Sequence, residues 1–211
     1  MQSPGPARST DPDTQMCDPR ADYYLEIEDY RGAISLHQKF LERHPESAIA
    51  HYHLGFAYGL TARHEDELRE YQQAVNLGFS NWELFLNLGL LYLERGRGQA
   101  AADVLRLATL LAPEHPEPHF NLAMAYKNLA RLTEAQQEML LSLNLNPDQP
   151  DAHNNLGVIY AEKGDFKRAR EEWSDLVREK PDYQAAHTNL NILAVMEKSG
   201  SASRGGFVTA H

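Results

Sequence analysis

Cysteine and long apolar stretches are the features that this sequence has least of. Cys17 is the single cysteine among 211 residues, so an internal disulfide is excluded and the chain is compatible with a reducing compartment. No apolar run approaches the ~20 residues of a membrane-spanning helix, and the N-terminus lacks the apolar core of a signal peptide. We therefore expect a cytoplasmic protein with no membrane partner.

Positive charge is also scarce. The chain has 20 lysines and arginines against 30 aspartates and glutamates, which gives a net charge of −10 and a pI near 5.4. A nucleic-acid-binding protein would present a basic face to the phosphates. The composition therefore argues against a nucleic-acid partner and favours neutral or basic partners.

Familiar catalytic motifs are missing as well. The sequence has no phosphate-binding loop, no Gly-x-Ser-x-Gly elbow and no His-Glu-x-x-His pair of metal ligands. We therefore expect a protein that is not an enzyme, uses no cofactor and has no metal site.

What the sequence does contain is a repeat of 34 residues, in which two slots keep one residue type without interruption. They are the tyrosines Tyr24, Tyr58, Tyr92, Tyr126 and Tyr160, and the leucines Leu54, Leu88, Leu122, Leu156 and Leu190. The fullest copy reads Asn155-Leu156-Gly157, followed by Tyr160, Ala169, Trp173 and Pro181. Leu-Gly, Tyr, Ala, a large apolar residue and Pro at this period form the tetratricopeptide repeat signature. The chain therefore resembles that family.

The resemblance implies an all-α fold, a right-handed α-solenoid of antiparallel helix pairs with about five repeats and a terminal capping helix. Proline and polar residues predict a disordered leader over 1–17. The solenoid is expected over 18–198, with repeats at about 18–47, 48–81, 82–115, 116–149 and 150–183 and the capping helix at 184–198. Ser, Gly and Ala then predict a flexible tail over 199–211, in which Phe207 to His211 could instead form a docking peptide.

One glutamate interrupts the pattern. Glu67 stands in a slot that the other repeats give to alanine, where two helices are expected to cross closely. We expect this carboxylate to be crowded, so that Glu67→Ala is neutral or stabilising.

Histidine shares one slot of several first helices, at His51, His119, His153 and His187. Neighbouring first helices lie ~10 Å apart, which is too far for two of these imidazoles to share a metal ion with bonds of ~2 Å. We therefore expect them to have a structural role.

Asparagine occupies another slot, two residues before the small residue of the first helix, at Asn87, Asn121, Asn155 and Asn189. Asparagine is a poor helix former, so this row calls for an explanation. In tetratricopeptide proteins the slot faces the concave groove, and the row resembles the asparagine ladder of the O-GlcNAc transferase superhelix, which holds the backbone of an extended polypeptide. A carboxamide both donates and accepts hydrogen bonds, so it pairs with a peptide group whatever the side chain of the ligand.

The same family geometry implies an apolar floor and an acidic rim for that groove. The floor comprises Leu86, Leu90, Phe120, Met124, Val158 and Ile192, and the rim comprises Glu83, Glu117 and Asp151. Such a surface favours an extended peptide partner of apolar to basic character. With ~10 Å between repeats and ~3.3 Å per extended residue, each repeat should meet about three ligand residues.

Three function classes remain open. The first is a protein-protein interaction scaffold that binds an extended peptide segment of a partner in its concave groove. The second is a self-assembling scaffold, a homo-oligomer in which the terminal helix packs on another copy through Ile192, Val195 and Met196. The third is an accessory or recognition subunit of a glycosyltransferase-like enzyme.

Overall fold

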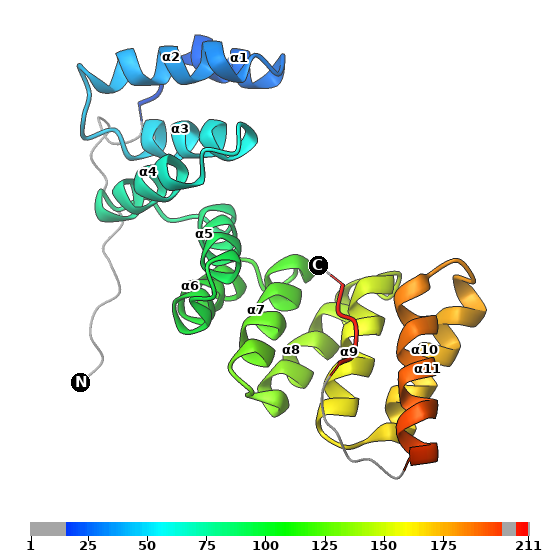
Figure 1. The fold of residues 1–211 in the computed structure, drawn as a ribbon. Coiled ribbons are helices and arrows are strands. Elements are labelled where there is room, and N and C mark those ends of the chain that lie inside the picture. Colours follow the sequence, from blue (N-terminus) through cyan, green and yellow to red (C-terminus); the bar gives the residue numbers. More distant parts are fainter. Residues whose placement is uncertain (1–15, 200–205, 211) are drawn as a thin grey trace, which may run out of the picture. The chain divides into compact units, whose positions relative to one another are not determined.

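The computed structural model describes residues 16–199 and 206–210. Within these ranges the chain forms eleven α-helices and no β-strand (Figure 1), in agreement with the all-α prediction. The helices are α1 (Pro19–Glu26), α2 (Tyr30–Leu41), α3 (Ala48–Leu60), α4 (His64–Asn76), α5 (Trp82–Glu94), α6 (Gly98–Leu111), α7 (Pro116–Asn128), α8 (Leu132–Leu145), α9 (Pro150–Glu162), α10 (Phe166–Glu179) and α11 (Gln184–Ser199). None of these helices is long and apolar enough to cross a membrane.

The chain divides into two compact units, Met1–Leu91 and Tyr92–His211. In the first unit α1 packs on α2, α2 on α3 and α3 on α4. In the second, α6 to α11 pack consecutively in the same way, and α11 also touches α9. Short loops between consecutive helices make them antiparallel neighbours. Each unit is therefore built from stacked helix pairs, as the 34-residue period predicts.

The tyrosine slot packs against an arginine that begins the following helix. The pairs, with the distance from guanidinium carbon to ring centre, are Arg63 with Tyr58 at 4.3 Å, Arg97 with Tyr92 at 4.7 Å and Arg131 with Tyr126 at 4.4 Å. A cation held over an aromatic face contributes ~0.5–1 kcal/mol at an exposed site. In these three repeats the tyrosine therefore belongs to the packing of its helix pair.

The turn inside each helix pair places one residue in the left-handed region. These residues also follow the period, at Glu28, Ala62, Gly96, Ala130 and Gly164, with φ between 56° and 84°. Only glycine adopts this conformation without a steric cost. In the other three turns the packing of the helix pair has to offset that cost.

The close helix crossings place a small residue against a large ring. A Cβ added to Gly157 would lie 2.4 Å from Nε1 of Trp173, and one added to Gly55 would lie 2.6 Å from Cδ1 of Tyr71. Both rings are fully buried. Glycine in this slot is therefore a steric requirement of the ring that faces it.

Glu67 is buried, but its carboxylate has both space and a partner. Its Oε2 lies 3.0 Å from Nδ1 of His64. The neighbouring Gly59 leaves room for the carboxylate, because a Cβ added there would lie 2.6 Å from Oε1 of Glu67. The crowding expected from the sequence is thus relieved, and the expectation of a neutral Glu67→Ala substitution needs revision.

We now expect Glu67→Ala to lower the free energy of unfolding by ~1 kcal/mol, because it removes a hydrogen-bonded pair and leaves a void beside Gly59. Thermal unfolding followed by circular dichroism measures this change. Glu65→Ala, at an exposed position of the same helix, is the control and should cost less. An unfolding midpoint unchanged by Glu67→Ala would support the original expectation instead.

Both ends of the repeat array differ from the expected boundaries. Met16 and Cys17, assigned to the leader, contact the first unit: the Ser47 hydroxyl donates to the Met16 carbonyl, and the Cys17 thiol donates to Asp22. Residues 206–210, assigned to the flexible tail, lie against the second unit. The rest of the leader, 1–15, and the tail residues 200–205 and 211 lie outside the described residues.

Candidate peptide-binding site

The C-terminal segment of the chain, residues 206–210, lies beside two helices of the second unit. We call it the tail segment; it forms no regular secondary structure, and Figure 1 shows it in red running alongside α9. Three asparagines donate to its backbone carbonyls, Asn154 and Asn155 from α9 and Asn189 from α11. The tail segment is therefore held largely through its main chain.

The side chains of Asn189 and Asn155 each make two hydrogen bonds to the backbone of one residue of the tail segment, one as donor and one as acceptor. Asn189 donates to the Val208 carbonyl at 2.9 Å and accepts from the Val208 N–H at 2.7 Å. Asn155 donates to the Ala210 carbonyl at 2.9 Å and accepts from the Ala210 N–H at 3.0 Å. Alternate residues of an extended chain point the same way. Two asparagines from consecutive repeats therefore contact alternate residues of one extended segment.

The contacts of these two asparagines correct the expected ligand spacing. One repeat separates Asn155 from Asn189, but the residues they hold, Ala210 and Val208, are two apart rather than three. Two extended residues span ~6.6 Å, less than the ~10 Å between packed helices. The sequence estimate used the distance between helix axes, whereas the spacing on the tail segment is set by the positions of the two carboxamides.

Asn154 and Trp173, which the sequence analysis did not select, complete the site. Asn154 donates to the Val208 carbonyl at 2.9 Å, and its Oδ1 accepts from Asn189 at 2.9 Å. Its backbone carbonyl accepts from Nε1 of Trp173 at 3.1 Å. The ring of Phe207 lies 5.3 Å from that of Trp173, at an interplanar angle of 33°. The buried tryptophan thus positions an asparagine and also receives the aromatic side chain of the tail segment.

The 34-residue period could have identified Asn154, because it occupies the slot of the expected floor residues Leu86 and Phe120. No periodic pattern in the sequence predicted that Trp173 contacts Phe207 of the tail segment. The slot of Trp173 holds a fully buried core residue in the preceding repeats, such as Leu105 and Met139.

The other two members of the asparagine row have partners elsewhere. Asn87, in the first unit, donates to the Tyr71 hydroxyl at 3.2 Å. Asn121, in the second unit, donates to the Glu117 carbonyl of its own helix at 2.9 Å. The structure therefore brings only Asn155 and Asn189 of the predicted row to the tail segment.

The expected floor and rim residues divide between the units. Met124 and Val158 are buried and Phe120 and Ile192 are half-buried in the second unit, whereas the first unit holds half-buried Glu83 and Leu86 and exposed Leu90. A pocket of about 200 Å³ brings together four of the predicted residues with Gln149 and Pro150, namely Glu117, Phe120, Asn121 and Asp151. Asp151 also accepts from the Tyr183 hydroxyl at 2.7 Å. Phe120 of the expected floor and Glu117 and Asp151 of the expected rim therefore meet in one pocket of the second unit.

The histidine row links each helix pair to the preceding loop. Nδ1 of His51, His119 and His153 lies 2.6, 2.7 and 2.9 Å from Oε2 of Glu70, Glu138 and Glu172, respectively. Nε2 of each lies within 3.2 Å of a proline carbonyl, as does Nε2 of His187. The hydrogen bond with Glu172 raises the pKa of His153. These contacts agree with the structural role expected from the sequence.

Models described as tetratricopeptide repeat match residues 19–78, 116–149 and 139–171, which together make up more than half of the chain. The chain is a tetratricopeptide repeat (TPR) protein. No curated protein is a significant match.

Solved structures of other TPR proteins share the fold. YrrB, described as a TPR protein with an unusual peptide-binding site, superposes with a TM-score of 0.74 and 24% identity, over 85% of this chain and 88% of YrrB. A crystal structure of MamA gives 0.71 and 20%, over 79% of this chain and 97% of that one. MamA from Desulfovibrio magneticus RS-1, residues 41 to the end, gives 0.70 and 18%, over 78% and 94%. At these identities the likeness shows the TPR solenoid fold.

Proposed function

We propose that this TPR protein is a non-catalytic protein-interaction scaffold whose second unit binds an extended peptide by its backbone. The observation that carries the proposal is the pair of two-way contacts from Asn155 and Asn189 to Ala210 and Val208. These contacts use main-chain atoms only, so a partner of different sequence can replace the tail segment if it adopts the same conformation.

The surroundings of the tail segment favour a particular partner chemistry. The tilted contact of Phe207 with Trp173 favours an aromatic residue immediately before the first residue that the asparagines hold. Asn189 holds Val208 and Asn155 holds Ala210, so the next asparagine of the row, Asn121, is expected to meet the residue two positions after Ala210. The pocket that Asn121 lines also includes Glu117 and Asp151. Acidic side chains there favour lysine or arginine in the partner, roughly five extended residues after the aromatic one.

The comparisons support this proposal by analogy. YrrB is described as a TPR protein with a peptide-binding site, and it shares the fold of this chain. The likeness of the asparagine row to that of the O-GlcNAc transferase superhelix belongs to the same proposal, because both pair carboxamides with a peptide backbone. A cytoplasmic location, consistent with the single Cys17, also remains part of it.

A self-assembling scaffold is the second candidate function, and the tail segment is the observation that favours it. The contacts that hold Val208 and Ala210 within one chain can also form between two copies that exchange their tails. Light scattering across concentrations separates this candidate from a monomeric peptide receptor, because exchange predicts a mass that rises with concentration.

The proposed function is tested with a chain truncated after residue 205 and a fluorescent peptide of residues 205–211. Binding is followed by fluorescence anisotropy. Asn155→Ala with Asn189→Ala removes four hydrogen bonds to the peptide, each worth ~0.5–1.5 kcal/mol, so we expect an affinity loss of about 30-fold or more.

Asn128→Ala is the control for this experiment, because Asn128 is exposed at the end of α7 and should leave affinity unchanged. Far-UV circular dichroism checks that the double variant is folded. Undiminished binding by the folded double variant, or no binding by the truncated chain, would contradict the proposal.

A further inference from the structure

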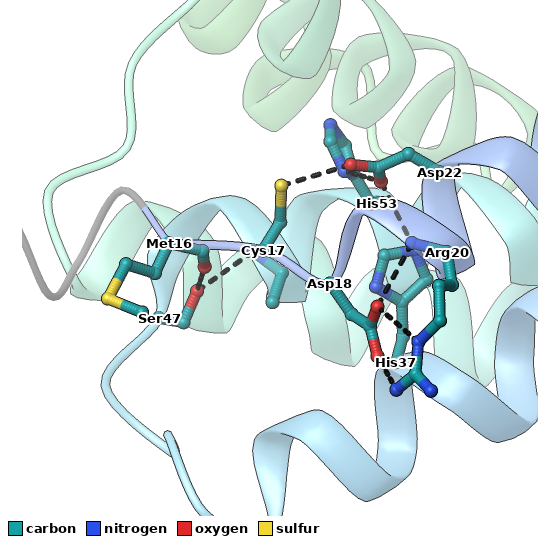
Figure 2. A network of polar contacts seen from close by, with 9 residues as sticks. Met16, Cys17, Asp18, Arg20, Asp22, His37, Ser47 and His53 are labelled. Atoms are coloured by element: carbon teal, nitrogen blue, oxygen red, sulfur yellow. Dashed lines mark hydrogen bonds and ion pairs between the residues drawn. The ribbon is translucent and has the colours of Figure 1, made fainter.

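A second polar cluster lies in the first unit, at the start of the described chain. Cys17 precedes α1, Asp22 lies on α1 and His53 on α3 (Figure 2). The Cys17 thiol donates to Oδ2 of Asp22 at 3.0 Å, and Nδ1 of His53 lies 2.6 Å from Oδ1 of Asp22. One potential ligand atom of each residue lies within 4.8 Å of the other two. A thiol, a carboxylate and an imidazole therefore converge on one point.

His37 on α2 is next to this cluster and is unusual for a core residue. It is 0% exposed, and neither ring nitrogen has a hydrogen-bond partner. Leaving a buried polar atom unsatisfied costs ~1–3 kcal/mol. Nε2 of His37 lies 3.6 Å from Oδ1 of Asp22, and its ring centre lies 5.7 Å from that of His53. The unsatisfied nitrogen therefore faces the carboxylate that Cys17 and His53 also contact.

Later repeats place other residue types in the slots of His37, His53 and Asp22, so the TPR core does not require these three side chains. The slot of His37 holds large, fully buried side chains in the later repeats, namely Tyr71, Leu105, Met139 and Trp173. The slot of His53 holds the asparagine row, and the slot of Asp22 holds Phe56, Leu90, Met124, Val158 and Ile192. The first two repeats replace apolar and amide groups with two imidazoles and a carboxylate, Asp22 and His37 in the first repeat and His53 in the second. Packing does not account for that substitution.

We propose that Cys17, Asp22, His37 and His53 bind one divalent transition-metal ion of the zinc class. A thiolate, a carboxylate and two imidazoles are ligand types that zinc accepts in four-coordinate sites. Bonds of ~2.0–2.3 Å in a tetrahedron place ligand atoms ~3.3–3.8 Å apart, so the separations of up to 4.8 Å among Cys17, Asp22 and His53 need small side-chain movements. His37, whose Nε2 lies 3.6 Å from Asp22, would have to move toward the other two ligands when the ion binds. Calcium and magnesium prefer oxygen ligands, and thiolate with imidazole selects a softer ion.

Charge fits such an ion. A thiolate and a carboxylate together neutralise a divalent cation, which reduces the cost of placing the charge in a partly buried site. Binding of the ion would displace the proton that the Cys17 thiol donates to Asp22.

The position of the site indicates what the ion would do. It would join Cys17, which precedes α1, to α1, α2 and α3 of the described first unit. The terminal repeats of a solenoid lack a neighbour on one side. A metal ion shared by these elements would stabilise that edge of the first unit without adding a helix.

The test uses the full-length chain, reduced and freed of metal, titrated with Co²⁺ as a spectroscopic probe and then with Zn²⁺ as a competitor. We expect one Co²⁺ per chain, with the visible bands of a tetrahedral ion and a near-ultraviolet thiolate-to-cobalt charge-transfer band, both removed by Zn²⁺. Cys17→Ala should abolish the charge-transfer band. The double variant His37→Leu with His53→Asn should weaken Co²⁺ binding by more than about 100-fold.

The double variant is also its own folding control, because it installs the residues found two periods later in these slots, Leu105 and Asn121. His44→Asn, which changes a histidine outside the cluster, should bind Co²⁺ like the original chain. Absence of the charge-transfer band in the original chain would overturn the proposal. So would unchanged affinity in the folded double variant, or an equal loss of affinity in His44→Asn.

Discussion

Removing residues 206–211 should raise the affinity of the chain for a peptide of residues 205–211 about 10-fold, because the tail segment competes for the same asparagines. Residues 200–205 tether the tail segment to α11, and a short tether gives an effective concentration on the order of 1 mM. If the open groove binds this peptide with a Kd of roughly 100 μM, the tethered competitor raises the apparent Kd about 10-fold. Fluorescence anisotropy on the full-length and truncated chains measures the ratio.

A pair of substitutions at one position gives the matched control. Val208→Pro removes the N–H that donates to Asn189 and should release the tail segment, so that the full-length variant binds added peptide like the truncated chain. Val208→Ala keeps that N–H and should bind like the original chain. Equal affinities for the full-length and truncated chains would mean that the tail segment does not occupy the groove in solution, whereas failure of both to bind would count against the proposed function itself.

Gly157→Ala should destabilise the second unit by ~1–3 kcal/mol through overpacking. The added Cβ would lie 2.4 Å from Nε1 of Trp173, and this indole is fully buried and bonded to the Asn154 carbonyl. The ring is rigid and cannot move without breaking that hydrogen bond. Chemical denaturation followed by tryptophan fluorescence and circular dichroism measures the change in free energy of unfolding.

The neighbouring repeat provides a compensating change. In the slots of Gly157 and Trp173 it carries Ala123 and Met139, both fully buried. Adding Trp173→Met to Gly157→Ala should therefore recover much of the lost stability, because methionine is flexible and smaller than the indole ring. If the double variant is less stable than Gly157→Ala alone, steric conflict with the ring is not the cause of the loss.

Much of the fold could be predicted from the sequence because TPR packing repeats locally. The Tyr58 and Tyr126 slots mark the same turn in different repeats, and each ring packs against an arginine only five residues later. The small residue at position 157 is likewise predictable, because it faces the large residue at position 173 of the same repeat. Contacts of this kind span one helix pair, so a pattern of one period is sufficient to predict them.

The candidate site was predictable only in part. Asn155 and Asn189 were selected by their register and residue type, and both contact a peptide backbone in the structure. Asn154 was missed although it shares the slot of the floor residues Leu86 and Phe120, because the floor was selected by apolar residue type and not by slot alone. Glu67 was misjudged because the space that Gly59 leaves for its carboxylate depends on the adjacent helix.

The 34-residue pattern was sufficient to predict the helix pairs, their order and the slots that form the core, because these depend on contacts within one repeat or between adjacent repeats. The segment that binds the asparagines and the residues that contact Asp22 were not predictable in this way. Asn155 contacts Ala210 across 55 positions of the chain, and His53 contacts Asp22 across 31. Such contacts join residues of unrelated slots or of a segment outside the repeats, so no periodic pattern records them, and only the folded chain brings them within hydrogen-bond distance.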